Sequence, residues 1–146
     1  MTLLYADTSA LFKRYVEEEE SEAVLVRIEE APSVGTSLIT RVEVAAALAQ
    51  AVRQDRMGRV EAQEAEREFL GDWHDFTRIG VTRAVATRAG HLAWEHDLRG
   101  YDAMQLAAAL TWQDTVEAGG DEVVFACFDH DLRRAATAAG LETWPE

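Results

Sequence analysis

Four acidic side chains stand where the sequence is expected to pass from a strand to a helix. Asp7 and Asp129 each follow a short apolar run, and Glu43 and Asp102 each stand near the start of a stretch with helical character. In a parallel α/β sheet the carboxyl ends of the strands lie along one edge, and ligands bind there. We therefore expect these four carboxylates to come together although they are far apart in the chain.

A cluster of carboxylates is unfavourable without a cation, because like charges at close range repel one another and raise each other's pKa. A divalent metal ion would offset this repulsion. The four histidines form no ligand-like group in the sequence, so the donors would be hard oxygen atoms, which favour Mg²⁺ or Mn²⁺ over zinc. Such an ion can activate water and stabilise a phosphoryl transition state. We predict that the metal ligands, which are also the catalytic residues, are Asp7, Glu43, Asp102 and Asp129.

Each of these acids also has a structural interpretation. Asp is favoured at helix N-caps, and Thr40 and Glu43 match the Thr-x-x-Glu pattern of a capping box. Independent capping does not require that all the acids lie at the same sheet edge, so we favour the metal site for the set. The acids for which N-capping is the alternative are Asp7, Asp102, Asp129 and Asp131.

Short apolar runs alternate with helical patterns along the chain. Because strands that alternate with helices at this spacing imply a parallel sheet covered on both faces, we predict an α/β fold. The expected strands are residues 3–6, 34–39, 76–81, 123–127 and 141–144. The expected helices are residues 10–16, 21–30, 40–53, 59–73, 83–96, 102–118 and 130–139.

The composition predicts one domain, residues 1–146, because a chain of this length with 48% hydrophobic residues can bury one core. No apolar stretch is long enough to cross a bilayer, no export leader is evident, and Cys127 has no partner for an internal disulfide. We expect a cytoplasmic protein. The net charge of −13 argues against a broad RNA-binding face and favours metal ions or a basic protein segment as partners.

Four motifs in this order and spacing resemble the PIN-domain family, and most closely the VapC-like toxins of bacterial and archaeal toxin–antitoxin pairs. They are Tyr5–Leu11, Thr40–Glu43, Tyr101–Leu106 and Phe128–Leu132, and the resemblance covers nearly the whole chain. It implies a three-layer α/β/α sandwich with a central parallel sheet. It also implies a ribonuclease whose acids hold Mg²⁺ or Mn²⁺ and hydrolyse RNA phosphodiesters, leaving a 5′-phosphate and a 3′-hydroxyl.

The resemblance also assigns roles to residues and partners. Asp7, Glu43, Asp102 and Asp129 occupy the four acid positions of the family. Thr8 or Ser9 would supply a supporting hydroxyl, and Asp131 would assist or replace Asp129. Cys127 stands where relatives often carry Thr or Ser, which puts one supporting hydrogen bond in doubt. The implied partners are an RNA substrate and a small antitoxin whose basic or apolar tail blocks the acidic site, within a homodimer and a toxin–antitoxin hetero-oligomer.

Several arginines stand next to the acids in sequence and could contact the RNA backbone as a narrow basic rim. They are Arg41, Arg99, Arg133 and Arg134. The first alternative function is a catalytically inactive PIN-like scaffold, although all four acids are present. A receiver-type signalling module is disfavoured because one acid follows the first strand and the only lysine is Lys13. A haloacid-dehalogenase-type phosphatase would need a second Asp two residues after Asp7, where Ser9 stands.

Overall fold

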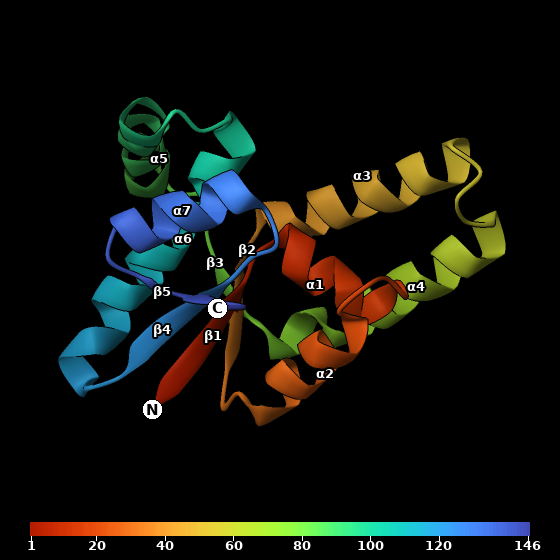
Figure 1. Cartoon of the computed structure of the whole chain (residues 1–146), viewed down its shortest axis with the longest axis horizontal. Helices are drawn as coiled ribbons and strands as arrows, with labels where there is room; N and C mark the ends of the chain where they lie inside the picture. Colours follow the sequence, from red (N-terminus) through yellow and green to blue (C-terminus); the bar gives the residue numbers. More distant parts are fainter.

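A five-stranded parallel sheet lies at the centre of the computed structural model, which describes residues 1–146 (Figure 1). The strand order is β3-β2-β1-β4-β5, and every neighbouring pair is parallel. The α/β/α architecture expected from the sequence is thereby confirmed. The strands are β1 (Thr2–Ala6), β2 (Val34–Ser37), β3 (Thr77–Ile79), β4 (Glu122–Ala126) and β5 (Glu142–Trp144).

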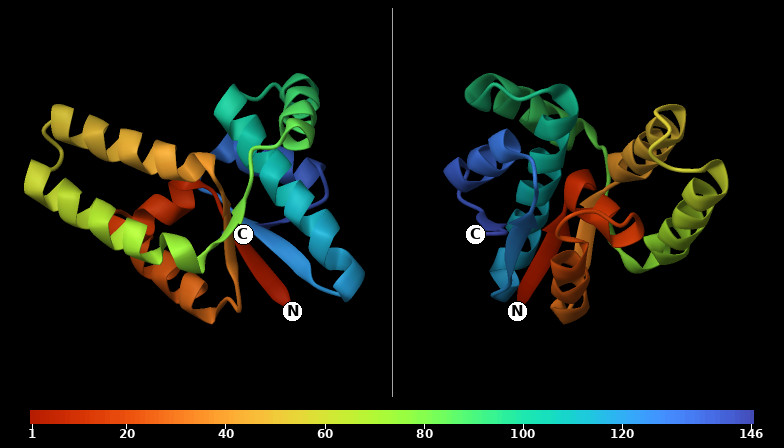
Figure 2. Two further views of the ribbon diagram at one scale, coloured as in Figure 1. Left: turned by 180° about the vertical axis from the view of Figure 1, so that it is seen from behind. Right: turned by 45° about the vertical axis from the view of Figure 1, so that its right-hand side comes forward.

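Seven helices form the outer layers, four on one face of the sheet and three on the other (Figure 2). The first group is α1 (Thr8–Tyr15), α2 (Ser21–Glu30), α3 (Ile39–Arg53) and α4 (Arg59–Asp72). The second is α5 (Arg83–His96), α6 (Gly100–Val116) and α7 (His130–Ala138). Two short 3₁₀ turns, η1 (Trp73–Asp75) and η2 (Glu117–Gly119), follow α4 and α6. None of the helices is long and apolar enough to span a membrane.

The two central strands are buried on both faces because successive side chains point to opposite sides of a strand. Tyr5 of β1 and Phe125 of β4 face α5, α6 and α7, and their rings stack with centroids 5.4 Å apart. Leu4 and Val124, one residue earlier in each strand, face the other core, together with α1, α3 and α4. Apolar runs in which polar and apolar residues do not alternate therefore correspond to strands that contribute side chains to both hydrophobic cores.

Helix α6 is the most deeply buried helix, and it lies close against β2. Gly35 makes this approach possible, because a Cβ atom at that position would lie 2.5 Å from the ring of Trp112 on α6. This close approach holds the C-terminal half of α6 against the sheet. Helices α3 and α4, in contrast, form an antiparallel pair that extends away from the sheet (Figures 1 and 2).

Three of the expected helix starts were wrong. Helix α1 begins at Thr8, two residues before the expected Ala10. Helix α3 begins at Ile39 after Leu38, and no side chain caps it, because Thr40 is buried and bonds to other segments instead of to the helix end. Helix α6 begins at Gly100, so Asp102 lies within its first turn and does not cap it. The capping interpretations of Glu43 and Asp102 are therefore wrong. Strands β2 and β3 are also shorter than expected, and residues 38 and 39 already turn into α3.

Candidate active site

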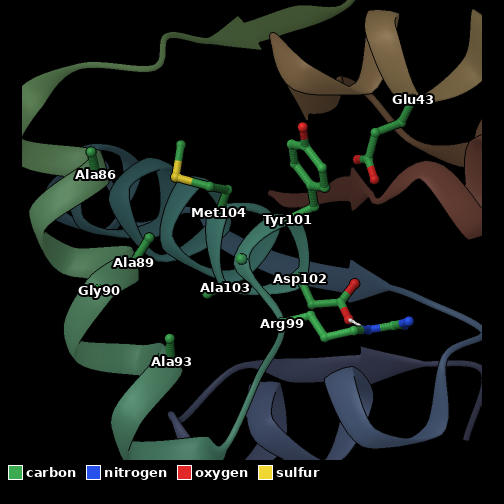
Figure 3. A pocket seen from close by; sticks show the side chains of 11 residues that line it. Glu43, Ala86, Ala89, Gly90, Ala93, Arg99, Tyr101, Asp102, Ala103 and Met104 are labelled. Carbon is green, nitrogen blue, oxygen red and sulfur yellow. Dashed lines mark hydrogen bonds and ion pairs between the residues drawn. The ribbon is translucent and has the colours of Figure 1, made fainter. Parts of the chain in front are cut away.

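The acids predicted from the sequence lie at the carboxyl edge of the sheet and come from four segments. Asp7 directly follows β1, and Asp129 follows β4 as the N-cap of α7. Glu43 lies in the second turn of α3, which follows β2, and Asp102 lies in the first turn of α6. Figure 3 shows Glu43 and Asp102 bordering the same hollow from these two helices.

Asp7 is the buried member of the group, with only 4% of its surface exposed. Its Oδ1 atom accepts hydrogen bonds from the Ser9 hydroxyl at 2.7 Å and from the Ala10 backbone N–H at 3.0 Å. Asp7 is therefore the N-cap of α1 as well as a member of the acidic group. Burial raises the pKa of Asp7 from 3.8 to about 6, although these hydrogen bonds act to lower it.

The thiol of Cys127 links Asp7 to Asp129. Cys127 Sγ donates to Asp7 Oδ2 at 3.2 Å and accepts the backbone N–H of Asp129 at 3.3 Å. Burial and the adjacent Asp7 charge raise the pKa of Cys127, so the thiol keeps the proton that it donates. Because Cys127 stands where relatives often carry Thr or Ser, a supporting hydrogen bond at this position was in doubt. In the structure the Cys127 thiol donates a hydrogen bond to Asp7.

Glu43 is held by donors from two other segments. Its Oε1 atom accepts from Thr8 Oγ1 at 2.7 Å and from Gln105 Nε2 at 2.8 Å. Gln105 is buried, and its Oε1 atom accepts from the Tyr5 hydroxyl at 2.6 Å. Burial raises the pKa of Tyr5 well above its usual value, so this phenol remains a donor.

Sequence reasoning missed Gln105, Tyr5 and Thr40 as residues of this site. A signal was present, because Gln105 interrupts the apolar stripe of α6 within the motif Tyr101–Leu106. A polar side chain at a core position needs a hydrogen-bond partner. The identity of that partner could not be read from residues so distant in the chain.

Arg99 connects the other two acids. Its Nε atom lies 3.3 Å from Asp102 Oδ2, and its Nη2 atom lies 3.9 Å from Asp129 Oδ2. Asp129 Oδ1 accepts the backbone N–H of Leu132 at 2.9 Å and thereby caps α7. Partial burial is the main cause that raises the pKa of Asp102, the negative charge of Asp129 adds to it, and Arg99 opposes it. The guanidinium group thus neutralises part of the acidic group.

Asp131 does not join the hydrogen-bonded acids. Its side chain is 83% exposed, and its nearest cationic partner is Arg134 at 4.0 Å. An exposed ion pair of this kind contributes little to stability. The side chain of Asp131 therefore makes no hydrogen bond to the other acids, although its negative charge adds to the raised pKa of Asp102.

The four arginines predicted as an RNA-binding rim differ in position. Only Arg99, whose side chain is 84% exposed, contacts the acids. Arg133 donates to the backbone carbonyl of Pro145 at 3.2 Å, near the end of the chain. Arg41 is exposed on α3, and its side chain makes no ion pair or hydrogen bond in the structure. Arg99 is therefore the basic side chain best placed at the acidic edge.

A hollow of about 680 Å³ lies beside the acids, between α5 and the start of α6 (Figure 3). Glu43, Arg99 and Asp102 line its polar side, and small residues of α5 line the other. Its volume is in the range of ligand-binding clefts. The exposed ring of Tyr101 also lines the hollow and lies beside Glu43 in the view of Figure 3.

The donor set fits a hard divalent ion in its chemistry. Every acid offers carboxylate oxygen atoms, and hard oxygen ligands are those that Mg²⁺ and Mn²⁺ prefer. No three Asp, Glu, His or Cys side chains, however, are arranged around a single point as a closed ligand set. The residues fit an ion held by few protein ligands and by water, which is the usual manner of binding for Mg²⁺.

Comparisons with known proteins show the family to which this chain belongs. The PIN-domain family model matches residues 4–138. The ribonucleases VapC45 and VapC49 of Mycobacterium tuberculosis are each 37% identical over 145 residues, which are 99% of this chain and 96% of theirs.

Solved structures share the fold at low sequence identity. VapBC2 from Rickettsia felis, bound to a DNA fragment from its promoter, gives a TM-score of 0.66 at 12% identity over 99% of both chains. The Mycobacterium tuberculosis toxin VapC20, which cleaves the sarcin–ricin loop, gives 0.61 at 20% identity over 94% of this chain and 95% of its own. With the family match and the full-length relatives, the conclusion is that this chain belongs to the PIN-domain family, as a homologue of the VapC ribonuclease toxins of type II toxin–antitoxin systems.

Proposed function

We propose that the protein is an Mg²⁺- or Mn²⁺-dependent endoribonuclease that acts as the toxin of a toxin–antitoxin pair. The observation that carries this proposal is the connected group of acids at the carboxyl edge of the sheet. Cys127 joins Asp7 to Asp129, and Arg99 joins Asp129 to Asp102. Glu43 is connected to this group because it accepts a hydrogen bond from Thr8, the residue after Asp7.

The metal ligands and catalytic residues in this proposal are Asp7, Glu43, Asp102 and Asp129. Asp7 and Asp102 would make the tightest metal contacts, and Glu43 and Asp129 would bind the ion directly or through water. A bound divalent ion would supply a Lewis acid that lowers the pKa of water and offsets the charge that develops on the phosphate. The chain's own contribution is to orient the carboxylates. Ser9 and the Ala10 N–H hold one oxygen of Asp7, and the donors to Glu43 all reach Oε1, so that Oε2 remains free of hydrogen bonds.

The RNA would lie along the hollow beside the acids and meet few positive charges. At a net charge of −13 the molecule as a whole repels polyanions. Arg99 is the first candidate for a phosphate contact, because it stands at the acidic edge. Arg41, Arg133 and Arg134 stay as weaker candidates, since the last two already contact the C-terminal segment and Asp131.

The proposed protein partner is a small antitoxin whose basic or apolar C-terminal tail covers the acidic site. We also propose a cytoplasmic location, a homodimer and a larger toxin–antitoxin hetero-oligomer. Trp94 on α5, whose large apolar side chain is 92% exposed, is a candidate contact in such an assembly. A short neighbouring reading frame with a DNA-binding N-terminus and a variable tail would identify the antitoxin.

The test is RNA cleavage by purified protein with Mg²⁺ or Mn²⁺ and with a chelator. We expect Asp102→Asn and Glu43→Gln each to reduce turnover by at least about 100-fold with an unchanged circular dichroism spectrum, because each removes a charge from the metal site and leaves the helix caps intact. Asp75→Asn is the matched control, since it removes the same charge from an exposed position before β3, at the opposite edge of the sheet.

Turnover at the wild-type level in Asp102→Asn would contradict the site assignment. A wild-type protein that binds the antitoxin but cleaves no RNA with either metal would favour the inactive scaffold.

A further inference from the structure

Gln105 makes more hydrogen bonds between segments than any other side chain at the acidic edge. The residue is 2% exposed, on the face of α6 that meets the sheet. Its Oε1 atom accepts from the Tyr5 hydroxyl at 2.6 Å. Its Nε2 atom lies 3.1 Å from Thr8 Oγ1, 3.0 Å from Thr40 Oγ1 and 2.8 Å from Glu43 Oε1.

The orientation of this amide is determined by the groups around it. In the observed orientation the Tyr5 hydroxyl donates to the amide oxygen, and the amide N–H groups face oxygen atoms. A flipped amide would place its oxygen against the Glu43 carboxylate and leave the buried Tyr5 proton without an acceptor. Unpaired buried polar groups are unfavourable, so the amide nitrogen is kept facing Glu43.

The donor and acceptor roles of the neighbouring threonine hydroxyl groups favour the same orientation of the Gln105 amide. Thr36 Oγ1 donates to the Ala6 carbonyl at 2.7 Å, so Thr40, 2.8 Å away, must donate to Thr36. Thr40 is then free to accept from Gln105. No buried side-chain nitrogen or oxygen is left without a partner in the structure.

The network leaves Glu43 with two unequal oxygen atoms. Oε1 accepts from both Thr8 and Gln105, whereas no hydrogen bond reaches Oε2. We infer that Gln105 is a positioning residue that fixes the Glu43 carboxylate with Oε2 directed away from the network, ready to bind a metal ion. This inference rests on the proposed function, because it assigns Glu43 to the metal site. A side chain whose rotamer is fixed in advance loses less conformational entropy on binding.

The test is a double-mutant cycle of Gln105→Met and Glu43→Ala. Met has nearly the length of Gln but donates no hydrogen bond. The first readout, called the Mn²⁺ midpoint below, is the apparent dissociation constant for Mn²⁺ fitted from the rise of the melting temperature with Mn²⁺ concentration, measured with the metal alone. The second is kcat and KM for RNA cleavage. Loss of a group that orients a metal ligand typically costs about 10- to 100-fold in metal affinity or activity.

We expect Gln105→Met to raise the Mn²⁺ midpoint and to lower kcat by about 10- to 100-fold, with KM for RNA nearly unchanged. With Glu43→Ala already present, Gln105→Met should change the Mn²⁺ midpoint by less than about 2-fold, because its effect passes through Glu43. Tyr5→Phe, which removes only the hydroxyl that orients the amide, should shift both quantities in the same direction by a smaller factor. This variant serves if Gln105→Met does not fold.

An equal change of the Mn²⁺ midpoint in both backgrounds would overturn the inference, because Gln105 would then act on the fold as a whole. Unchanged midpoints in both Gln105→Met and Tyr5→Phe would also overturn it. A wild-type protein that neither melts higher with Mn²⁺ nor cleaves RNA would instead refute the proposed function itself. The two failures are therefore distinguishable.

Discussion

Replacing Asp7 by Asn should stabilise the metal-free protein at neutral pH. Burial raises the pKa of Asp7 from 3.8 to about 6 in the folded protein. The folded state therefore favours the protonated carboxyl, and the associated stability is fully present below pH 3.8 and is lost as the pH rises through about 6. At about 1.36 kcal/mol per pKa unit, the ionised Asp7 costs about 3 kcal/mol at pH 8.

Asn resembles the protonated acid and keeps Oδ1 for the Ser9 hydroxyl and the Ala10 N–H. It loses the acceptor of the Cys127 thiol, at a cost of about 1 kcal/mol. The expected net gain for Asp7→Asn is about 2 kcal/mol at pH 8, which corresponds to about 4–8 °C in melting temperature for a chain of this size.

The assay is urea unfolding with a chelator at pH 8 and at pH 4, with Asp131→Asn as the control for removal of an exposed charge. The difference between Asp7→Asn and the wild type should be large at pH 8 and should shrink or reverse at pH 4. A variant that is less stable than the wild type at pH 8 would refute the reasoning and would mean that capping and hydrogen bonding outweigh the desolvation of the charge.

Further expected outcomes concern the metal, the RNA and the core. Millimolar Mg²⁺ or Mn²⁺ should raise the wild-type melting temperature in proportion to the logarithm of concentration, because the ion binds only the folded state, and Zn²⁺ should not be required; a melting curve unaffected by either ion would count against the site. Arg99→Ala should weaken RNA binding several-fold in filter assays. The same variant should bind Mn²⁺ more tightly, seen as a lower Mn²⁺ midpoint, because it removes the cation shared by two acids. No change in either quantity would make Arg99 an ordinary surface residue. The dependence of RNA affinity on salt should be shallow, and a log–log slope steeper than about −4, which at about 0.7 per contact means six phosphates, would contradict a narrow basic rim. Gly35→Ala should lower the free energy of unfolding in urea by about 1–3 kcal/mol, because the added Cβ atom would clash with Trp112. An unchanged urea concentration at half-unfolding would show that the Trp112 ring can move.

The expected fold followed from periodicity and from the residues at element ends. Helix α5 spans Arg83–His96 as the pattern predicts, because local signals mark both of its ends. The position of the acids also followed, because a parallel sheet brings the carboxyl ends of its strands to one edge. Asp7 and Asp129 follow neighbouring strands, and their meeting required no knowledge of side-chain packing.

Local sequence patterns gave a wrong prediction where hydrogen bonds to other segments were more favourable than a helix cap. Thr40 and Glu43 satisfy the pattern of a capping box, yet Thr40 bonds to Thr36 and Gln105 in the interior. A hydroxyl that can satisfy buried polar groups from two other segments stabilises the fold more than one that caps an exposed helix end.

The sequence by itself predicted the composition of the proposed site, with acids at one sheet edge and oxygen donors throughout. Its net charge of −13 argued against a broad RNA-binding face. Only the tertiary structure decided which oxygen atoms are engaged and which acid is hardest to ionise. Those properties depend on burial and on hydrogen bonds between residues 100 to 120 positions apart, such as Tyr5 with Gln105 and Asp7 with Cys127. Such pairs meet only after the sheet and α6 have packed, and no local pattern in the chain encodes their distance.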